Sequence, residues 1–203
     1  MKLNSLQDLL VMELQDLLGA ERQVLQAFPK LMKRITHPEL RKCVEQHFKD
    51  SKKQETRLEK CFQKLGVPVV AGRSHGIIGM ISAWSEFEAT EAQADVLDAA
   101  IISMIQHMEH YEIAGYGCAR AFAEVLDEAG VAELLQETLE EEEECDRRLT
   151  KLAETVVNVD AEAHSRSGLC RWILWVDLSA MLCGSVKKHE DCVCLMRERW
   201  CFF

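Results

Sequence analysis

The segment IQHMEHYEIAGYG (residues 105–117) places two glutamates in what is otherwise the apolar stripe of a helix. Alternating steps of four and three residues keep one side of a helix against its neighbours. On that side lie Asp98, Ile102, Ile105, Glu109, Glu112, Tyr116, Ala119 and Ala123. Glu109 and Glu112 are in the middle of the stripe, and a buried carboxylate is costly unless it is paired, hydrogen-bonded or bound to metal. The segment therefore predicts a long helix that carries acids into the interior.

The same pattern recurs in three other segments of the chain. We expect long helices at about residues 5–35, 39–65, 91–127 and 131–157, separated by proline and glycine signals. Near the middle of each stripe lie polar or acidic residues: Glu21 in the first helix, His47, Asp50 and Gln54 in the second, Glu109 and Glu112 in the third, and Glu142 with Asp146 in the fourth. Four interrupted stripes favour a shared polar centre.

The composition favours an all-α protein, because Leu, Ala, Glu and Lys are plentiful while Pro and aromatic residues are scarce. The connection between the second and third helices, residues 67–90, is too long for a tight turn. We expect a short helix at about residues 77–87 that lies across the bundle. The predicted fold is an antiparallel four-helix bundle with a long crossover between its second and third helices.

The charge balance limits the possible partners. Lys and Arg total 24 against 34 Asp and Glu, which gives a formal net charge of −10. We expect no nucleic-acid partner, because binding to phosphates requires a basic face. We also expect no membrane partner and a cytoplasmic location, because no stretch reads as a signal peptide or a membrane span. In that compartment Cys43, Cys61, Cys118 and Cys145 are expected to be reduced thiols.

The last forty residues differ in composition from the rest. They hold five of the nine cysteines and three of the four tryptophans, without the CxxC spacing of a zinc knuckle. We therefore divide the chain into a helical domain at residues 1–162 and a Cys/Trp-rich tail at residues 163–203. Two interpretations of the tail are open: an added helix with a docking arm, or poorly ordered, non-native sequence from an altered reading frame or splice product.

If the helices pack antiparallel, the acids of the four stripes fall at roughly one level. Oxygen ligands at these spacings on facing helices can hold two first-row metals about 3.5–4 Å apart. Ligation rich in oxygen favours iron or manganese over Cu(I) or structural zinc. We therefore predict a dinuclear Fe or Mn site that is fully or partly occupied. Its predicted ligands are Glu21, Asp50, Gln54, Glu109, Glu112, Glu142 and Asp146.

Other interpretations of these residues stay open. The stripes could be offset by one position, so that the acids flank the seam and pair with Lys or Arg. His47 could hydrogen-bond Asp50, and His107 with His110 is more typical of a surface pair than of a zinc site. Tyr116, one turn after Glu112, could orient a ligand or only pack.

Several of these segments resemble the YciF-type stress-response proteins, a branch of the ferritin-like superfamily. The resemblance rests on ELQDLLGAE (residues 13–21), residues 47–58, EHYEIAGY (109–116), and LQETLEEE (135–142) with Asp146. It covers roughly residues 3–162. It implies a ferritin-like bundle with a dimetal-type site, a homodimeric cytosolic protein and a role in stress tolerance. The sequence departs from the ferritin-like pattern, because it contains no Glu-x-x-His and has Asp50 and Gln54 where a fuller ligand set would have Glu with His or Gln.

Three functions are compatible with these observations. The first is a metal-binding ferritin-like stress-response protein that could act on oxygen or peroxide. The second is a non-enzymatic dimeric stress protein with a vestigial metal site. The third, a storage cage, is disfavoured because the sequence lacks the short fifth helix that such cages use. Whether the protein is an enzyme is not decided by the sequence.

Overall fold

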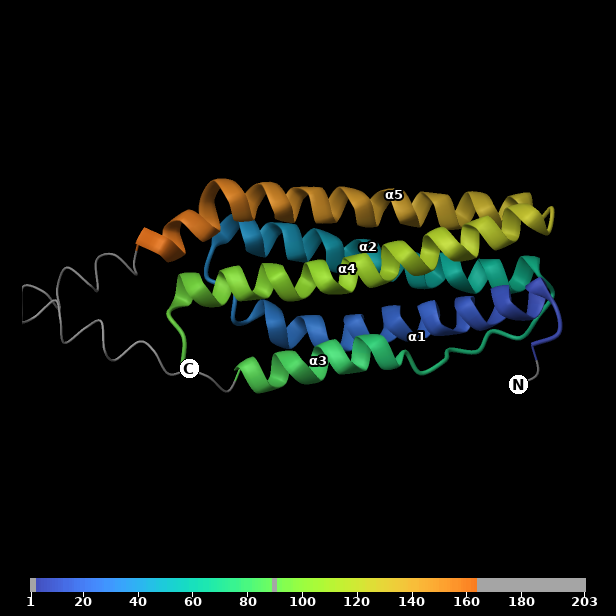
Figure 1. Cartoon of the computed structure of the whole chain (residues 1–203), viewed down its shortest axis with the longest axis horizontal. Coiled ribbons are helices and arrows are strands. Elements are labelled where there is room, and N and C mark those ends of the chain that lie inside the picture. The colour runs from blue at the N-terminus through green and yellow to red at the C-terminus, as the bar shows by residue number, and fades with distance from the viewer. Residues whose placement is uncertain (1–2, 89–90, 164–203) are drawn as a thin grey trace, which may run out of the picture. The chain divides into compact units, whose positions relative to one another are not determined.

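The computed structural model describes residues 3–88 and 91–163, and within them the chain is helical without a strand. Figure 1 shows the four long helices and a shorter one beside them. The bounds are α1 Leu6–Met32, α2 Pro38–Lys64, α3 His75–Glu88, α4 Ala94–Val125 and α5 Ala129–Leu152, followed by the π-helical segment η1 Ala153–Val157. The prediction of an all-α protein is confirmed. The predicted tail at residues 163–203 lies, but for its first residue, outside the described residues.

The bounds of the long helices follow the signals in the sequence. Their starts and ends fall within three residues of the predicted positions, except that α5 ends at Leu152 and η1 continues it. The start of α1 is fixed by a capping box, in which the Asp8 amide donates to Ser5 and the Ser5 amide donates to the Asp8 carboxylate. At the turn between α1 and α2, the backbone amides of Thr36 and His37 donate to the carboxylate of Asp98 on α4, at 2.9 and 2.8 Å.

The long helices pack in a closed order, α1 against α2, α2 against α5, α5 against α4, and α4 against α1. The colours in Figure 1 show that α1 and α5 run in one direction and that α2 and α4 run in the other. Each packed pair is therefore antiparallel. Because α2 and α4 run the same way, the chain between them has to return along the length of this unit.

The segment that makes this return is α3 with the stretch before it. It packs against α1 and α4 and runs in the direction of α1 (Figure 1), whereas we expected a helix lying across the others. Close backbone contact holds the segment in place: the Gly72 amide donates to the carbonyl of Gln15 at 2.6 Å. A Cβ on Gly19 would clash with the Gly72 carbonyl. The side chains of Ile77 and Trp84 anchor α3, because both are buried in the apolar core.

The apolar core is divided into two clusters, and polar residues lie between them. One cluster contains Val24, Val44, Met108 and Cys145, and the other contains Leu18, Leu58, Tyr116 and Leu139. In every long helix, buried polar residues come between a member of one cluster and a member of the other. These residues are Glu21 in α1, His47, Ser51, Gln54 and Arg57 in α2, Glu109 and Glu112 in α4, and Glu142 in α5. The buried Asp98 and Thr138 lie instead between members of a single cluster. The four interrupted stripes therefore meet in one polar layer.

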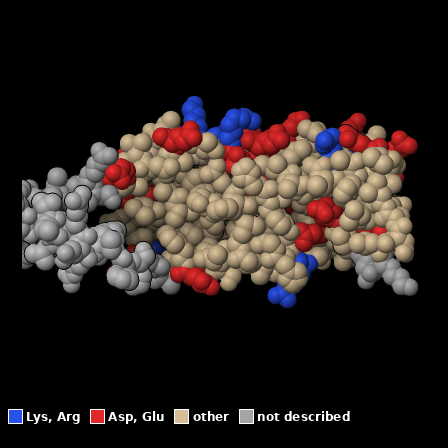
Figure 2. All heavy atoms as spheres, viewed as in Figure 1, with Lys and Arg blue, Asp and Glu red and all other residues tan. Residues whose placement is uncertain are grey.

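On the surface, acidic side chains gather with a few basic ones along the edge formed by α5 (Figure 2). Among the described residues, no helix has an apolar stretch long enough to cross a membrane.

Candidate metal centre

Four buried side chains from three helices converge in the polar layer. His47 comes from α2, Glu109 and Glu112 come from α4, and Glu142 comes from α5. Each offers one ligand atom, and these atoms all lie within 4.8 Å of one another. Their exposed fractions are between 0% and 5%. A group of this kind can replace the hydration shell of a divalent cation with protein atoms.

His47 is the centre of this group. Its Nε2 lies 3.1 Å from Oε1 of Glu109, and its Nδ1 lies 3.8 Å from Oε2 of Glu142. The imidazole ring packs against Phe28, with 5.2 Å between the ring centroids. The apolar contact on one side and the carboxylates on the other leave the ring little freedom. A fixed imidazole is suited to binding a metal through one of its nitrogens.

The remaining long helix, α1, contributes Glu21. Its carboxylate accepts a hydrogen bond of 2.6 Å from the hydroxyl of Tyr116. Glu21 is close enough to Glu112 and Glu142 for their charges to influence one another. The hydrogen bond from Tyr116 holds Oε1 of Glu21, and Oε2 is buried without a hydrogen-bond partner among the described residues.

Five carboxylate oxygens of the layer have no hydrogen-bond partner among the described residues. They are Oε2 of Glu21, Oε2 of Glu109, Oε1 of Glu112 and both oxygens of Glu142. Buried polar atoms are nearly always paired, and an unpaired one costs about 1–3 kcal/mol. Five such atoms in one place indicate a cation that they coordinate or protons that they retain.

The electrostatics of the layer lead to the same choice between a bound cation and retained protons. Burial raises the pKa of Glu109 well above its usual value, and the charge of Glu142 raises it further. Burial also raises the pKa of Glu21, with a further contribution from Glu142, and it raises the pKa of Glu112, with a further contribution from Glu21. Glu21, Glu109 and Glu112 therefore favour the protonated form as long as no cation is present. A divalent cation would compensate the charges and allow the acids to ionise.

The structure brings together four of the seven residues predicted as ligands: Glu21, Glu109, Glu112 and Glu142. Gln54 is also buried in the layer, but its side-chain amide donates to Oε2 of Glu141 at 3.1 Å. Its Oε1 has no partner among the described residues.

The other two predicted ligands, Asp50 and Asp146, lie apart from the cluster and are partly exposed. Asp50 accepts hydrogen bonds from Gln46 and Lys53, at 2.8 and 2.7 Å. Asp146 accepts one of 3.0 Å from Gln106 and is 3.5 Å from Nε2 of His110.

His47 was not among the predicted ligands, although the sequence carried a signal for it. It occupies a stripe position of its helix, between Val44 and Ser51. The sequence interpretation paired it with Asp50, whereas in the structure its carboxylate neighbours are Glu109 and Glu142.

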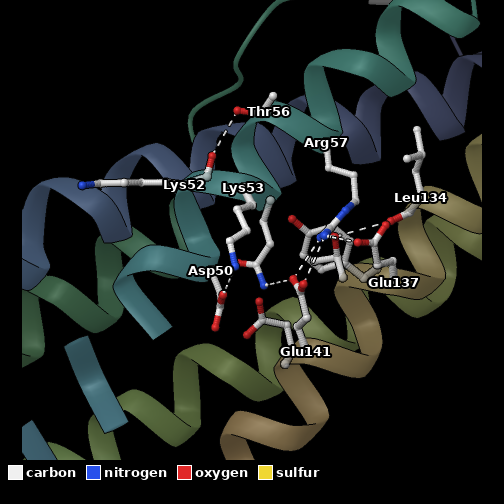
Figure 3. A network of polar contacts seen from close by, with 12 residues as sticks. Asp50, Lys52, Lys53, Thr56, Arg57, Leu134, Glu137 and Glu141 are labelled. Atoms are coloured by element: carbon white, nitrogen blue, oxygen red, sulfur yellow. Dashed lines mark hydrogen bonds and ion pairs between the residues drawn. The ribbon is translucent and has the colours of Figure 1, made fainter. Parts of the chain in front are cut away.

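A second feature that the sequence did not reveal is the buried Arg57, shown in Figure 3. Its guanidinium donates to Thr138 at 2.7 Å, to Glu141 at 2.9 Å and to Glu137 at 2.7 Å. Because Glu141 also accepts from Gln54, this network joins α2 to α5 beside the polar layer. Arg57 thus neutralises acids next to the candidate centre but contacts none of its four clustered side chains in these hydrogen bonds.

Comparison with known proteins supports a relationship over most of the chain. A family model described as a domain of unknown function (DUF892) matches residues 5–162. Protein YciF of Escherichia coli (strain K12) is 32% identical over 163 residues, which are 80% of this chain and 98% of YciF. The resemblance to YciF-type proteins is confirmed.

Two solved structures agree with this relationship. The crystal structure of the E. coli stress protein YciF matches with a TM-score of 0.73 and 31% identity, over 77% of this chain and 99% of that one. YcfI, described as a putative structural protein from Rhodopseudomonas palustris, matches with a TM-score of 0.71 and 35% identity, over 72% of this chain and 94% of that one.

Proposed function

The chain belongs to the DUF892 family, and from this premise we propose that it is a metal-binding stress-response protein with a dinuclear iron or manganese site. The proposed fold is a ferritin-like antiparallel four-helix bundle whose crossover contains α3. The closed packing order and the alternating directions of the long helices support this fold.

The observation that carries the metal proposal is the set of unpartnered oxygens. Five carboxylate oxygens in a buried layer lack a hydrogen-bond partner among the described residues, and His47 offers them an adjacent nitrogen. A set of ligands dominated by oxygen with one imidazole is of the kind that Fe(II) and Mn(II) accept. The sequence also allowed acids that flank the seam and pair with Lys or Arg. Glu137 and Glu141 fit that description, because both pair with Arg57, whereas the acids with unpartnered oxygens do not.

The residues divide naturally between two metal positions. His47, Glu109, Glu112 and Glu142 would hold the first, because their ligand atoms lie within 4.8 Å of one another. Glu21 would bind the second metal, and Glu112 and Glu142 would bind both metals. The charge of Glu142 raises the pKa of Glu21, and the charge of Glu21 raises the pKa of Glu112, so the three acids are close together. Tyr116 would orient Glu21 through its hydroxyl. In this proposal Asp50 and Asp146 are not ligands.

A redox-active metal at this site would supply electrons to dioxygen or peroxide. The protein supplies a layer closed off from water by an apolar cluster at either side. The metal-binding residues and the tyrosine beside them are almost fully buried, so only a small oxidant would reach them.

The second candidate is a non-enzymatic stress protein with a vestigial site. It is favoured by the small number of nitrogen ligands, because His47 is the one histidine in the ligand clusters of the described residues. In that case the acids would simply retain their protons, as their raised pKa values allow. The protein would then act through contacts between copies or with other proteins.

Titration with Mn(II) separates these two candidates. Free Mn(II) has a strong electron paramagnetic resonance signal that is lost on binding, so the bound fraction can be measured directly. We expect saturable binding by the full chain and much weaker binding by a Glu109→Gln/Glu142→Gln variant. Mn(II) that stays free at protein concentrations well above those of the metal would contradict a metal function and favour the vestigial site. Consumption of peroxide by Fe(II)-loaded protein would then distinguish an enzyme from a metal-binding protein.

A further inference from the structure

Cys43 on α2 and Cys145 on α5 form a pair of thiols beside the polar layer. Both are free, and Cys43 packs against the apolar cluster that contains Cys145. The two thiols are close enough that their interaction lowers the pKa of Cys43 and raises the pKa of Cys145. Cys145 is buried, whereas Cys43 is partly exposed. The two helices pack against each other, so the contact joins segments that are 102 positions apart in the chain.

Cys43 can be reached from the solvent. It lines a hollow of about 380 Å³ whose wall also contains Lys42, Arg148 and Lys151, together with Glu39, which pairs with Lys42 at 2.7 Å. The interaction with Cys145 lowers the pKa of the Cys43 thiol, burial opposes this shift, and the charge of Arg148 adds to it. A partly exposed thiol that shares a hollow with Arg148 and Lys151 is in the kind of environment that reactive cysteines occupy.

We propose that Cys43 and Cys145 form a reversible disulfide when the protein meets a hydroperoxide. The geometry assigns the roles: Cys43, which faces the hollow, reacts first, and the buried Cys145 resolves it. This inference goes beyond the proposed metal function and does not depend on it.

The two steps balance as follows. The thiolate of Cys43 attacks the terminal oxygen of the hydroperoxide, the O–O bond breaks, and Cys43 becomes a sulfenic acid while an alcohol or water leaves. The sulfur of Cys145 then attacks the sulfur of Cys43, the S–O bond breaks, and hydroxide leaves with the Cys145 proton as water. The hydroperoxide is reduced by two electrons, and the two thiols are oxidised to one disulfide.

The other described cysteines lack this combination of features. Cys61 is fully buried, so a hydroperoxide does not reach its thiol from the solvent. Cys118 is exposed on α4 and serves as a comparison for simple accessibility. The pair also reaches the candidate metal centre, because the Cys145 thiol donates to Oε1 of Glu109 at 3.5 Å. Disulfide formation would remove that donor.

Peptide mapping of the full chain tests the proposal. The protein is treated with hydrogen peroxide, the remaining thiols are alkylated, and tryptic peptides are analysed by mass spectrometry without reduction. Trypsin separates Cys43 in peptide 43–49 from Cys145 in peptide 121–147, and each of these peptides contains a single cysteine. The cysteines of residues 164–203 fall in other peptides, so their oxidation does not interfere with the readout.

We expect most of peptide 43–49 to become linked to peptide 121–147 and to be released by dithiothreitol. A Cys43→Ser variant should lose the linked species, whereas a Cys118→Ser variant should form it as the unchanged protein does. Three outcomes would overturn the proposal: both thiols remain alkylatable, Cys43 accumulates as sulfinic acid without a link, or Cys43 links mainly to a cysteine other than Cys145. The measurement on the unchanged protein is decisive even if a variant folds poorly.

Discussion

Nε2 of His47 lies 3.1 Å from Oε1 of Glu109, and this contact joins α2 to α4 in the polar layer between the two apolar clusters. Sixty-two positions separate the two residues in the chain, and both are almost fully buried. The contact places an imidazole nitrogen among the buried acids, and several expected outcomes of the metal proposal depend on it.

Replacement of His47 by Leu should weaken Mn(II) binding by at least about tenfold, because the cluster loses its nitrogen ligand. The matched control is His110→Leu, because the side chain of His110 is 66% exposed and pairs with Asp146 instead. Dissociation constants from isothermal titration calorimetry check this prediction. Equal weakening by both substitutions would assign His47 a structural role only.

Replacement of Glu142 by Leu should abolish metal uptake and leave the metal-free protein as stable as before, or more stable by about 1–4 kcal/mol. The reason is that Glu142 is fully buried and both of its oxygens lack a hydrogen-bond partner among the described residues. Unfolding in urea without metal provides the measurement, and Glu143→Leu, at the exposed neighbouring position, is the control. If Glu142→Leu unfolds the metal-free protein, Glu142 is a structural residue.

The stability of the metal-free protein should fall as the pH rises. Glu21, Glu109 and Glu112 have raised pKa values in the folded chain, mainly because they are buried, so the folded state binds more protons than the unfolded one above a pH of about 4.5. Their stabilising contribution is complete below that pH and is lost as the pH rises through the folded-state pKa values. The slope is about 1.4 kcal/mol per pH unit for each proton released on unfolding.

Urea midpoints measured from pH 4.5 upward, with and without Mn(II), check this dependence. Added Mn(II) should flatten the decline, because metal replaces the protons. A metal-free stability that instead increases over this range would show that the acids are ionised and paired in the folded protein.

Substitution of Asp50 or Asp146 by Ala should leave Mn(II) affinity within about twofold, because both carboxylates bond to polar side chains outside the cluster. Glu112→Ala should weaken binding strongly in the same assay. A large loss of affinity in Asp50→Ala would mean that this side chain turns inward when metal binds, and it would restore the ligand set predicted from the sequence.

The spacing of residues predicted the helices and the polar layer well, and the structure explains why. Stripe positions repeat along a helix, so Glu21, Glu109, Glu112 and Glu142 could be assigned to the interior from the sequence alone. Each polar residue also lies between residues that pack into different apolar clusters. Antiparallel packing therefore brings all of them to one level.

The assignment was less accurate for residues next to the stripe. Neighbouring positions on a helix differ by about 100° around its axis. Asp50 precedes the buried Ser51 and Asp146 follows the buried Cys145, so both carboxylates turn toward the partly exposed flank. The stripe position of His47 indicated that it is buried but did not identify its neighbours, because Glu109 comes from another helix and Asp50 is nearer in the sequence.

The metal content of protein purified without chelator tests the central claim most directly. Inductively coupled plasma mass spectrometry should find iron or manganese in stoichiometric amounts in the full chain and almost none in a Glu109→Ala/Glu142→Ala variant that remains folded by circular dichroism. Equal metal content in the two proteins, or no metal in either after incubation with Fe(II) or Mn(II), would contradict a cation-binding role for the buried acids.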